Sequence, residues 1–205
     1  LNGVVFAISV DSLLGRSAAE LEEAARSLRL RLNELTFELG VDLPVYVMIT
    51  KADHIEGFVE CFDASPVVHP GGAVGWSNDQ RRLANAEERV VQGFSGILAR
   101  LESVLPELIL RDPDRSRRRR IHAFPQELDE VVRAAARFIG RAFAPSAYDS
   151  APFLRGVYLT SARRQGATVS PQLHRLGHDW ARHRVEDSRV SGGILLRDLF
   201  HEIVI

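Results

Sequence analysis

A lysine and an aspartate stand at the point where an apolar run of the sequence ends. The stretch Val45–Asp53 begins with five apolar residues, three of them β-branched, and closes on Thr50, Lys51, an alanine and Asp53. Such a run predicts a strand buried on both faces, as in a parallel sheet. Ligands of open α/β sheets bind just beyond the carboxyl ends of the strands, so these polar side chains are candidates for binding a ligand.

Lys51 differs in kind from the other basic residues. It is the one lysine among 26 basic residues, all others being arginine. A compact ammonium on a flexible stem has a different chemistry from a planar guanidinium, which favours a specific role for this position. The alternative is that Lys51 and Asp53 form a solvated pair of charges at a strand end, and such pairs contribute little to stability.

A second apolar run ends in the same way. Leu154–Thr160 predicts another buried strand, and it is followed by Ser161 and Ala162. The pair Ser161-Ala162 carries little information alone and counts only as a partner of the first motif. If the two strands belong to one sheet, their polar ends meet at a single site.

The first 50 residues predict a strand-helix-strand unit. Val4–Val10 is a buried strand, and Asp11 and the following serine mark a turn at its end. A helix then runs from Ser17 to residue 39, because Ser17 and Glu20 have the spacing of a capping box and Gly40 is a stop signal. With the strand at Val45, this is a βαβ unit with parallel strands.

The remaining chain is predicted to be mostly helical. We expect helices over residues 55–62, 78–105, 126–143 and 194–203, an irregular loop over 65–75, a basic linker over 111–120, a short strand over 121–124 and a loop or loosely packed helix over 167–191. The fold class is therefore α/β. We interpret the chain as one domain fragment in three parts. Residues 1–65 form the first part of the sheet, residues 66–150 a loop and helical insertion with a short strand, and residues 151–205 the last sheet strand and a closing helix.

Composition excludes several classes of function. The chain has 205 residues, a formal net charge of −1 and one cysteine. The charge gives no general reason to expect nucleic acid or an anionic membrane as partner, and no intrachain disulfide can form. No segment is long and apolar enough to span a bilayer. Both ends of the chain are interpreted as cut from something longer.

Other features receive a structural interpretation. His174 and His178 have the i, i+4 spacing of helical metal ligands, with Asp179 and His183 nearby, but no further ligand is fixed by spacing and no metal site is assigned. The run Arg117–Arg120 could meet phosphates or an anionic leaflet, although a solvated linker is favoured because no aromatic residues interleave. Cys61 is expected to be buried, and Trp76 to contact a partner or cover the core.

The two motifs together resemble a known family. A strand ending in Thr50-Lys51-Ala52-Asp53, followed by a strand ending in Ser161-Ala162, is similar to the guanine-recognition half of P-loop GTPases. Further strings, in order, are similar to the cytoplasmic domain of the large inner-membrane subunit of type VI secretion, the IcmF or TssM family. These strings are Leu1–Val5, Leu43–Asp53, Gly57-Phe58, Phe124-Pro125, Arg155–Ala162, Gln165-Gly166 and Leu195–Phe200.

The resemblance implies a partial P-loop GTPase-like parallel sheet, flanked by helices and carrying an inserted helical region. It implies a cytoplasmic domain of a bacterial inner-membrane protein, acting as a scaffold that joins the secretion membrane complex to the cytoplasmic baseplate. Other proteins of that complex and of the baseplate are the implied partners. In the site, Asp53 would take the Watson–Crick edge of guanine and Lys51 would lie along the base. Thr50 would tie neighbouring loops together, while Ser161 and the N–H of Ala162 would brace Asp53 and the base oxygen.

The chain departs from the GTPase pattern in one respect. A P-loop needs a lysine and a hydroxyl that reach phosphates and Mg²⁺, and no such motif is present. In the family it would lie upstream of Leu1, so this stretch alone is not expected to catalyse hydrolysis. No cofactor is assigned; GTP with Mg²⁺ is implied only for a longer stretch. The alternative function is a nucleotide-switching NTPase completed by that upstream half, and an unrelated α/β binding domain is favoured if the two motif strands are not neighbours.

Overall fold

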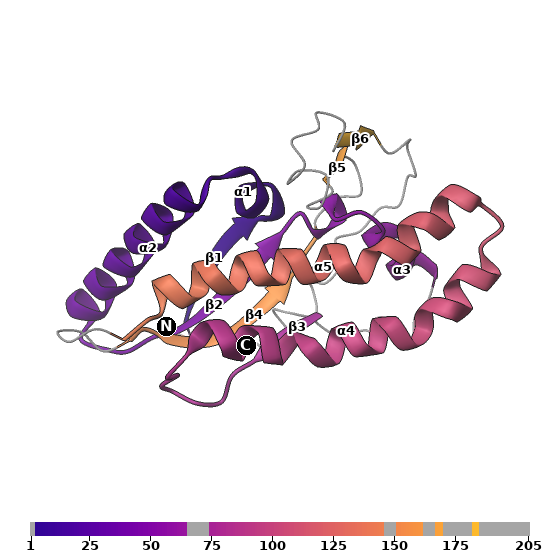
Figure 1. Ribbon diagram of the computed structural model, residues 1–205. Helices are drawn as coiled ribbons and strands as arrows, with labels where there is room; N and C mark the ends of the chain where they lie inside the picture. Colours follow the sequence, from indigo (N-terminus) through magenta and orange to yellow (C-terminus); the bar gives the residue numbers. More distant parts are fainter. Residues whose placement is uncertain (1–2, 65–73, 146–150, 162–166, 170–181, 185–205) are drawn as a thin grey trace.

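The fold is built on a four-stranded sheet with helices packed against it (Figure 1). The computed structural model describes residues 3–64, 74–145, 151–161, 167–169 and 182–184. Its elements are β1 (Val4–Ser9), α1 (Val10–Gly15), α2 (Ala18–Leu39), β2 (Pro44–Thr50), the 3₁₀ helix η1 (Ala52–His54), α3 (Phe58–Ala64), β3 (Val74–Ser77), α4 (Ala86–Arg111), α5 (Arg115–Ala142), β4 (Phe153–Leu159), β5 (Ala167–Val169) and β6 (Arg182–Arg184). The α/β class is therefore confirmed.

The sheet has the strand order β1-β2-β4-β3. β1 and β4 both pair with β2 in parallel, and β3 adds an antiparallel edge. Because β2 lies between two strands and under helices, its five central residues are all buried, which explains the continuous apolar run in the sequence. The prediction that the two motif strands are neighbours is confirmed.

The N-terminal half follows the sequence pattern closely. The Ser17 side chain accepts a hydrogen bond from the Glu20 N–H, and Glu20 in turn accepts from the Ser17 N–H, so that the capping box is complete. Gly40 ends α2 in the left-handed conformation. The turn expected at Asp11 is wrong: the chain enters the short helix α1, because Ser9 caps it through the Ser12 N–H.

The largest correction concerns the arginine run and the segment after it. Residues 111–124 are neither a linker nor a strand, since α4 extends to Arg111 and α5 begins at Arg115. The two helices form a long hairpin that extends beyond the sheet (Figure 1). Three of the arginines lie near carboxylates: Arg117 Nε is 2.9 Å from Asp112, Arg120 Nε is 2.5 Å from Glu60, and Arg119 is 3.9 Å from Glu56.

Pro125 lies inside α5 without ending it. A proline has no N–H, so the carbonyl of Ile121 loses its usual helical donor. The Cys61 thiol of α3 lies 4.0 Å from that oxygen and donates toward it. Cys61 is fully buried, as expected, and burial raises the pKa of its thiol to about 12, with a further contribution from the charge of Glu60. The helix therefore tolerates Pro125 because a neighbouring element contacts the free carbonyl.

Trp76 marks a strand that the glycine-rich sequence conceals. Val74–Ser77 is β3, where an irregular loop to residue 75 and then a helix from 78 were expected; α4 begins only at Ala86. The Trp76 ring lies directly over Gly93 of α4, where a Cβ would come within 2.2 Å of a ring carbon. Trp76 thus packs the sheet edge against α4, which is a structural role.

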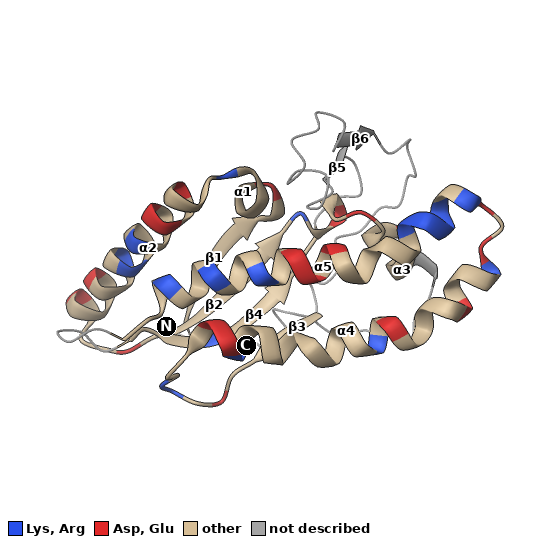
Figure 2. Cartoon of the chain, viewed as in Figure 1, with Lys and Arg blue, Asp and Glu red and all other residues tan. Residues whose placement is uncertain are grey.

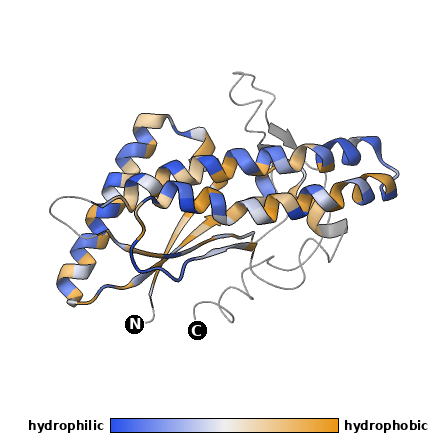
Figure 3. Cartoon of the chain, turned by 60° about the horizontal axis from the view of Figure 1, so that its bottom comes forward, coloured by the Kyte–Doolittle hydropathy of each residue, from blue (hydrophilic) through white to orange (hydrophobic). Residues whose placement is uncertain are grey.

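Figure 3 shows the alternation of apolar and polar residues along α4 and α5.

Helix predictions elsewhere hold in part. The expected helix over 55–62 is displaced to α3, and the expected helix over 126–143 is the second half of α5. Within the segment 167–191, β5 and β6 pair as antiparallel strands where a loop or helix was expected. The expected helix over 194–203 lies outside the described residues. No helix in the described part of the chain is long and apolar enough to cross a membrane.

Candidate functional site

The two sequence motifs meet at the carboxyl ends of β2 and β4. The Thr160 N–H donates to the Ile49 carbonyl (2.9 Å), and the Ala52 N–H donates to the Thr160 carbonyl (3.1 Å). These bonds continue the ladder past the last paired residues of the sheet. The backbone after each strand is therefore fixed relative to the other, and side chains from both can converge.

Asp53 and Ser161 form the centre of the site. The Ser161 hydroxyl donates to Asp53 Oδ1 at 2.5 Å, across 108 positions of sequence. Asp53 is 8% exposed and Ser161 1% exposed. A buried carboxylate that keeps one hydrogen bond of this kind is held in one orientation. Its second oxygen, Oδ2, lies 3.9 Å from His54 Nε2.

Asp11 links Lys51 to His54 beside this centre. Lys51 Nζ donates to Asp11 Oδ2 at 2.9 Å, and His54 Nδ1 lies 2.8 Å from Asp11 Oδ1. Because an ionised carboxylate only accepts, the His54 ring places its proton on Nδ1 in this contact. Lys51 adopts the left-handed conformation, with φ of 58°, which turns the chain from β2 into η1. Sequence reasoning missed Asp11 and His54, although Asp11 follows the strand next to β2 and so belongs to the same sheet edge.

The charges of this cluster stabilise one another. Burial raises the pKa of the Asp11 carboxyl, but hydrogen bonds from Lys51 and His54 outweigh it, so the pKa lies below the usual value. The hydrogen bond to Asp11 raises the pKa of Lys51, and the negative charge of Asp11 adds to this. Both groups are thus ionised at neutral pH. The solvated pair of Lys51 with Asp53 considered from the sequence is replaced by a pair of Lys51 with Asp11.

Replacing Asp11 with asparagine is expected to lower the free energy of unfolding by about 1 kcal/mol or less at pH 7, the range of partly exposed ion pairs. A carboxyl whose pKa is lowered by folding stabilises the protein above its unfolded pKa of about 3.9 and loses this contribution as pH falls through the folded value. Urea titrations at pH 7 and pH 3 measure the difference. Glu38→Gln, an exposed carboxylate of α2, is the control. A difference of equal size at both pH values would contradict the ion-pair account.

Of the two remaining predicted site residues, Thr50 and Ala162, the structure describes Thr50. Thr50 is the last residue of β2 and is paired in register with Ser9 of β1, so it lies on the β1 side of the site. Ala162 lies outside the described residues. Thr160, 1% exposed, carries a buried hydroxyl with no hydrogen-bond partner in the described structure. This hydroxyl, next to Ser161, can therefore form a further hydrogen bond at this end of the sheet.

A cavity of about 790 Å³ adjoins the site along the free edge of β1. Its walls are β1 from Val4 to Ser9 and the inner side of α2, with Thr50 and Ser12 at the end nearest Asp11. Among the described strands, β1 pairs with β2 alone. In the part of the chain that the structure describes, no further strand covers the polar end of the sheet on the β1 side.

The histidine pair of the sequence cannot be placed in this geometry. His174, His178 and Asp179 lie outside the described residues, and of His183 only its position in β6 is described. No group of three or more His, Cys, Asp or Glu side chains in the described part of the chain could hold a metal ion.

Comparison with known proteins places the whole chain in one family. The profile of the IcmF-related N-terminal domain matches residues 1–205. The chain belongs to the IcmF/TssM family. The resemblance to the IcmF/TssM family, drawn from the ordered strings of the sequence, is therefore confirmed.

The chain is similar in sequence to a known member of the IcmF/TssM family. The chain is 30% identical over 209 residues to the type VI secretion system component TssM1 of Pseudomonas aeruginosa. The match covers 99% of this chain and 19% of the relative, so the chain spans about a fifth of that protein's length. No solved structure matches the IcmF/TssM chain described here.

Proposed function

We propose that this chain is a scaffold and interaction domain of a type VI secretion membrane complex. It would act on the cytoplasmic side of a bacterial inner-membrane protein and link the membrane complex to the baseplate. Membership of the IcmF/TssM family and the likeness to TssM1 support this. The membrane would be reached through spans elsewhere in the parent protein, with other secretion components as partners.

We further propose that the domain holds the base-recognising half of a guanine-nucleotide site on a P-loop GTPase-like sheet. The observation that carries this is the buried Asp53 carboxylate, oriented by Ser161 at the ends of two adjacent parallel strands. Guanine presents two parallel N–H groups that match a carboxylate, and adenine does not. Lys51 lies at the same edge of the sheet and its ammonium donates to Asp11, while the buried Thr160 hydroxyl has no hydrogen-bond partner in the described structure.

A fluorescent guanine nucleotide titrated against a stretch of the parent protein extended upstream of Leu1, with and without Mg²⁺, tests this proposal. We expect saturable binding that falls tenfold or more in Asp53→Ala, at least about 1.4 kcal/mol. Asp42→Ala is the matched control, because Asp42 pairs with Arg81 and lies outside the site. The Asp53 variant must first show the far-UV circular dichroism of the folded protein.

Absence of binding by the folded wild-type protein would overturn the nucleotide half-site. The scaffold role would then stand alone, with Lys51 and Asp53 as structural residues. Equal affinity of the wild type and Asp53→Ala for the nucleotide would show that the nucleotide binds at a site without Asp53. The scaffold role has its own test, because deletion of residues 1–205 from the parent protein is expected to abolish secretion and baseplate recruitment in living cells.

The second candidate function is a nucleotide-switching NTPase, and the open edge of β1 favours it. The edge strand Val4–Ser9 has no charged residue or proline to keep another strand away. A further parallel strand in the 790 Å³ cavity would bring its own carboxyl end beside Ser9 and Thr50. Phosphate-binding groups at that end would complete the half-site.

A hydrolysis assay on the longer stretch separates the two candidates. An NTPase would release phosphate only with Mg²⁺, and Asp53→Ala would reduce the rate at subsaturating nucleotide. Binding without Mg²⁺-dependent hydrolysis would leave the scaffold with a nucleotide ligand. Protection of the β1 amides from hydrogen exchange in the longer stretch, compared with residues 1–205 alone, reports whether a strand has paired there.

A further inference from the structure

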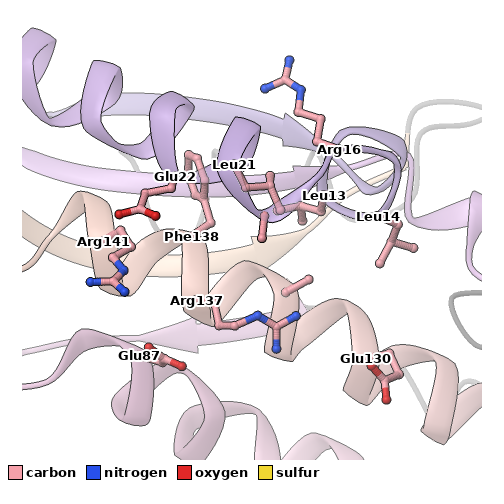
Figure 4. A pocket seen from close by; sticks show the side chains of 12 residues that line it. Leu13, Leu14, Arg16, Leu21, Glu22, Glu87, Glu130, Arg137, Phe138 and Arg141 are labelled. Carbon is pink, nitrogen blue, oxygen red and sulfur yellow. The ribbon is translucent and has the colours of Figure 1, made fainter. Parts of the chain in front are cut away.

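A second cavity lies between the helices, and no residue of β2 or β4 lines it. It has a volume of about 450 Å³ and opens between α1, the start of α2 and the second half of α5 (Figure 4). Leu13, Leu21 and Phe138 form part of its apolar lining, and charged side chains stand around them. Six of its twelve lining residues are charged, three arginines and three glutamates. A cavity of several hundred Å³ that joins apolar surface to polar groups is a candidate binding site.

Two arginines, Arg137 and Arg141, stand on the α5 wall of this cavity. Arg137 and Arg141 are exposed, and neither forms an ion pair with a carboxylate in the described part of the chain. Arg133, one turn earlier, does have one: its Nε lies 2.6 Å from Asp129 Oδ2. Figure 2 shows the basic residues spaced along this part of α5. Two adjacent guanidinium groups beside an apolar surface attract a carboxylate-bearing ligand.

The α5 wall of the cavity is long enough to lie beside a short bound helix, and the cavity is called the groove from here on. Its α5 wall runs from Glu130 to Arg141, and 11 steps of about 1.5 Å make roughly 16 Å, or three helical turns. Helices bind in such grooves by apolar residues at i, i+3 or i+4 and i+7. On the wall formed by α2, Glu22 lines the cavity, so the groove carries charge of both signs (Figure 4). A uniformly anionic polymer is therefore disfavoured, since Glu22, Glu87 and Glu130 also line the cavity.

We propose that this groove binds an amphipathic helix of a partner protein, with acidic residues facing Arg137 and Arg141 and apolar residues filling the space between Leu13, Leu21 and Phe138. This inference deepens the proposed scaffold role and rests on it, because it names the surface and the kind of segment that such a scaffold would hold. It does not depend on the nucleotide half-site, whose residues lie at the ends of β2 and β4.

The test uses a defined probe. A phage library of helix-forming 14-residue peptides, with leucine fixed at i, i+4 and i+7 and the flanking positions randomised among Glu, Lys, Gln and Ala, is panned against the 205-residue chain, whose fold is confirmed by circular dichroism. We expect enrichment of peptides with Glu at two positions four residues apart. The double variant Arg137→Glu/Arg141→Glu is expected to enrich Lys at those positions instead.

Affinities of the selected peptides complete the test. The best wild-type peptide is expected to bind the double variant at least tenfold more weakly, and its Glu-to-Lys counterpart to bind that variant more tightly than the wild type. Arg133→Glu, with the same change of charge on the same helix but outside the cavity lining, is the matched control and should keep wild-type binding. No enrichment on the wild type, or enrichment without acidic residues, would overturn the proposal. Equal loss in the Arg133 control would show a general effect of charge, which also contradicts it.

Failure of the helix-binding proposal can be distinguished from failure of the proposed scaffold function. In the parent protein, Arg137→Glu/Arg141→Glu should impair partner recruitment while guanine-nucleotide binding stays at the wild-type level. If recruitment is unchanged although selected peptides no longer bind, the groove does not serve the scaffold role and the inference fails, while the role itself survives.

Discussion

Replacing Gly57 with alanine is expected to destabilise the protein by about 3 kcal/mol, from a left-handed backbone at about 1–2 kcal/mol and an overpacked contact at about 1–3 kcal/mol. Gly57 has φ of 85°, a region that residues with a Cβ rarely adopt. A Cβ there would lie 2.2 Å from the Arg120 carbonyl oxygen and 2.7 Å from the Phe124 Cβ. Because the first obstacle is backbone, no side-chain rotation can relieve it.

Urea or thermal unfolding followed by circular dichroism measures this effect. Gly96→Ala is the matched control, because Gly96 lies in α4 with open space around its Cβ position, and it is expected to stabilise the protein by about 0.5–1 kcal/mol. If Gly57→Ala unfolds like the wild type, then α3 and α5 are not in contact at this point. The variant is expected to weaken ligand binding at the site as well, since Gly57 connects η1 to α3.

The contact at Gly57 illustrates what the sequence could not provide. Gly57 could be noted as a glycine after the motif, but its neighbour, Arg120, belongs to a segment that was interpreted as a linker. Residues 115–120 contain five arginines, and Pro125 follows five positions after the last of them. This composition hides the local pattern of a buried helix. The helix forms nevertheless, because its apolar face packs on the sheet and on α3, and Cys61 contacts the carbonyl that Pro125 leaves free. Tertiary contacts decide this element, and they have no local signature.

The strands that carry the site could be predicted because burial leaves a local record. β2 and β4 are mostly apolar since each is covered, Arg155 of β4 being the exception, and polar residues begin where each strand ends. Their adjacency, which the interpretation as a single site required, brings the Ser161 hydroxyl onto Asp53. Asp11 follows β1 and so meets the same rule, but its ion pair with Lys51, 40 positions later, has no local signature in the sequence. β3 was missed because Gly75 disrupts the apolar pattern in a strand of four residues.

Asp53→Asn is expected to change the base preference of the proposed site rather than only abolish binding. The carboxylate offers two acceptors, which match the N1–H and the amino group of guanine. A carboxamide offers one acceptor and one donor, and xanthine presents N1–H beside a carbonyl in place of the amino group. The substitution is nearly isosteric, and the amide oxygen can still accept from Ser161 because it has two lone pairs.

In a stretch of the parent protein extended upstream of Leu1, guanine-nucleotide affinity should therefore fall at least tenfold in Asp53→Asn, or about 1.4 kcal/mol. Affinity for the matching xanthine nucleotide should rise by a similar factor over the wild type. Competition titrations of the two nucleotides against one fluorescent probe give both values, and Asp53→Ala, which should bind neither well, is the control. If Asp53→Asn lowers the affinity for the guanine and the xanthine nucleotide by the same factor, Asp53 does not select the base. Its role would then be structural, through the hydrogen bond from Ser161.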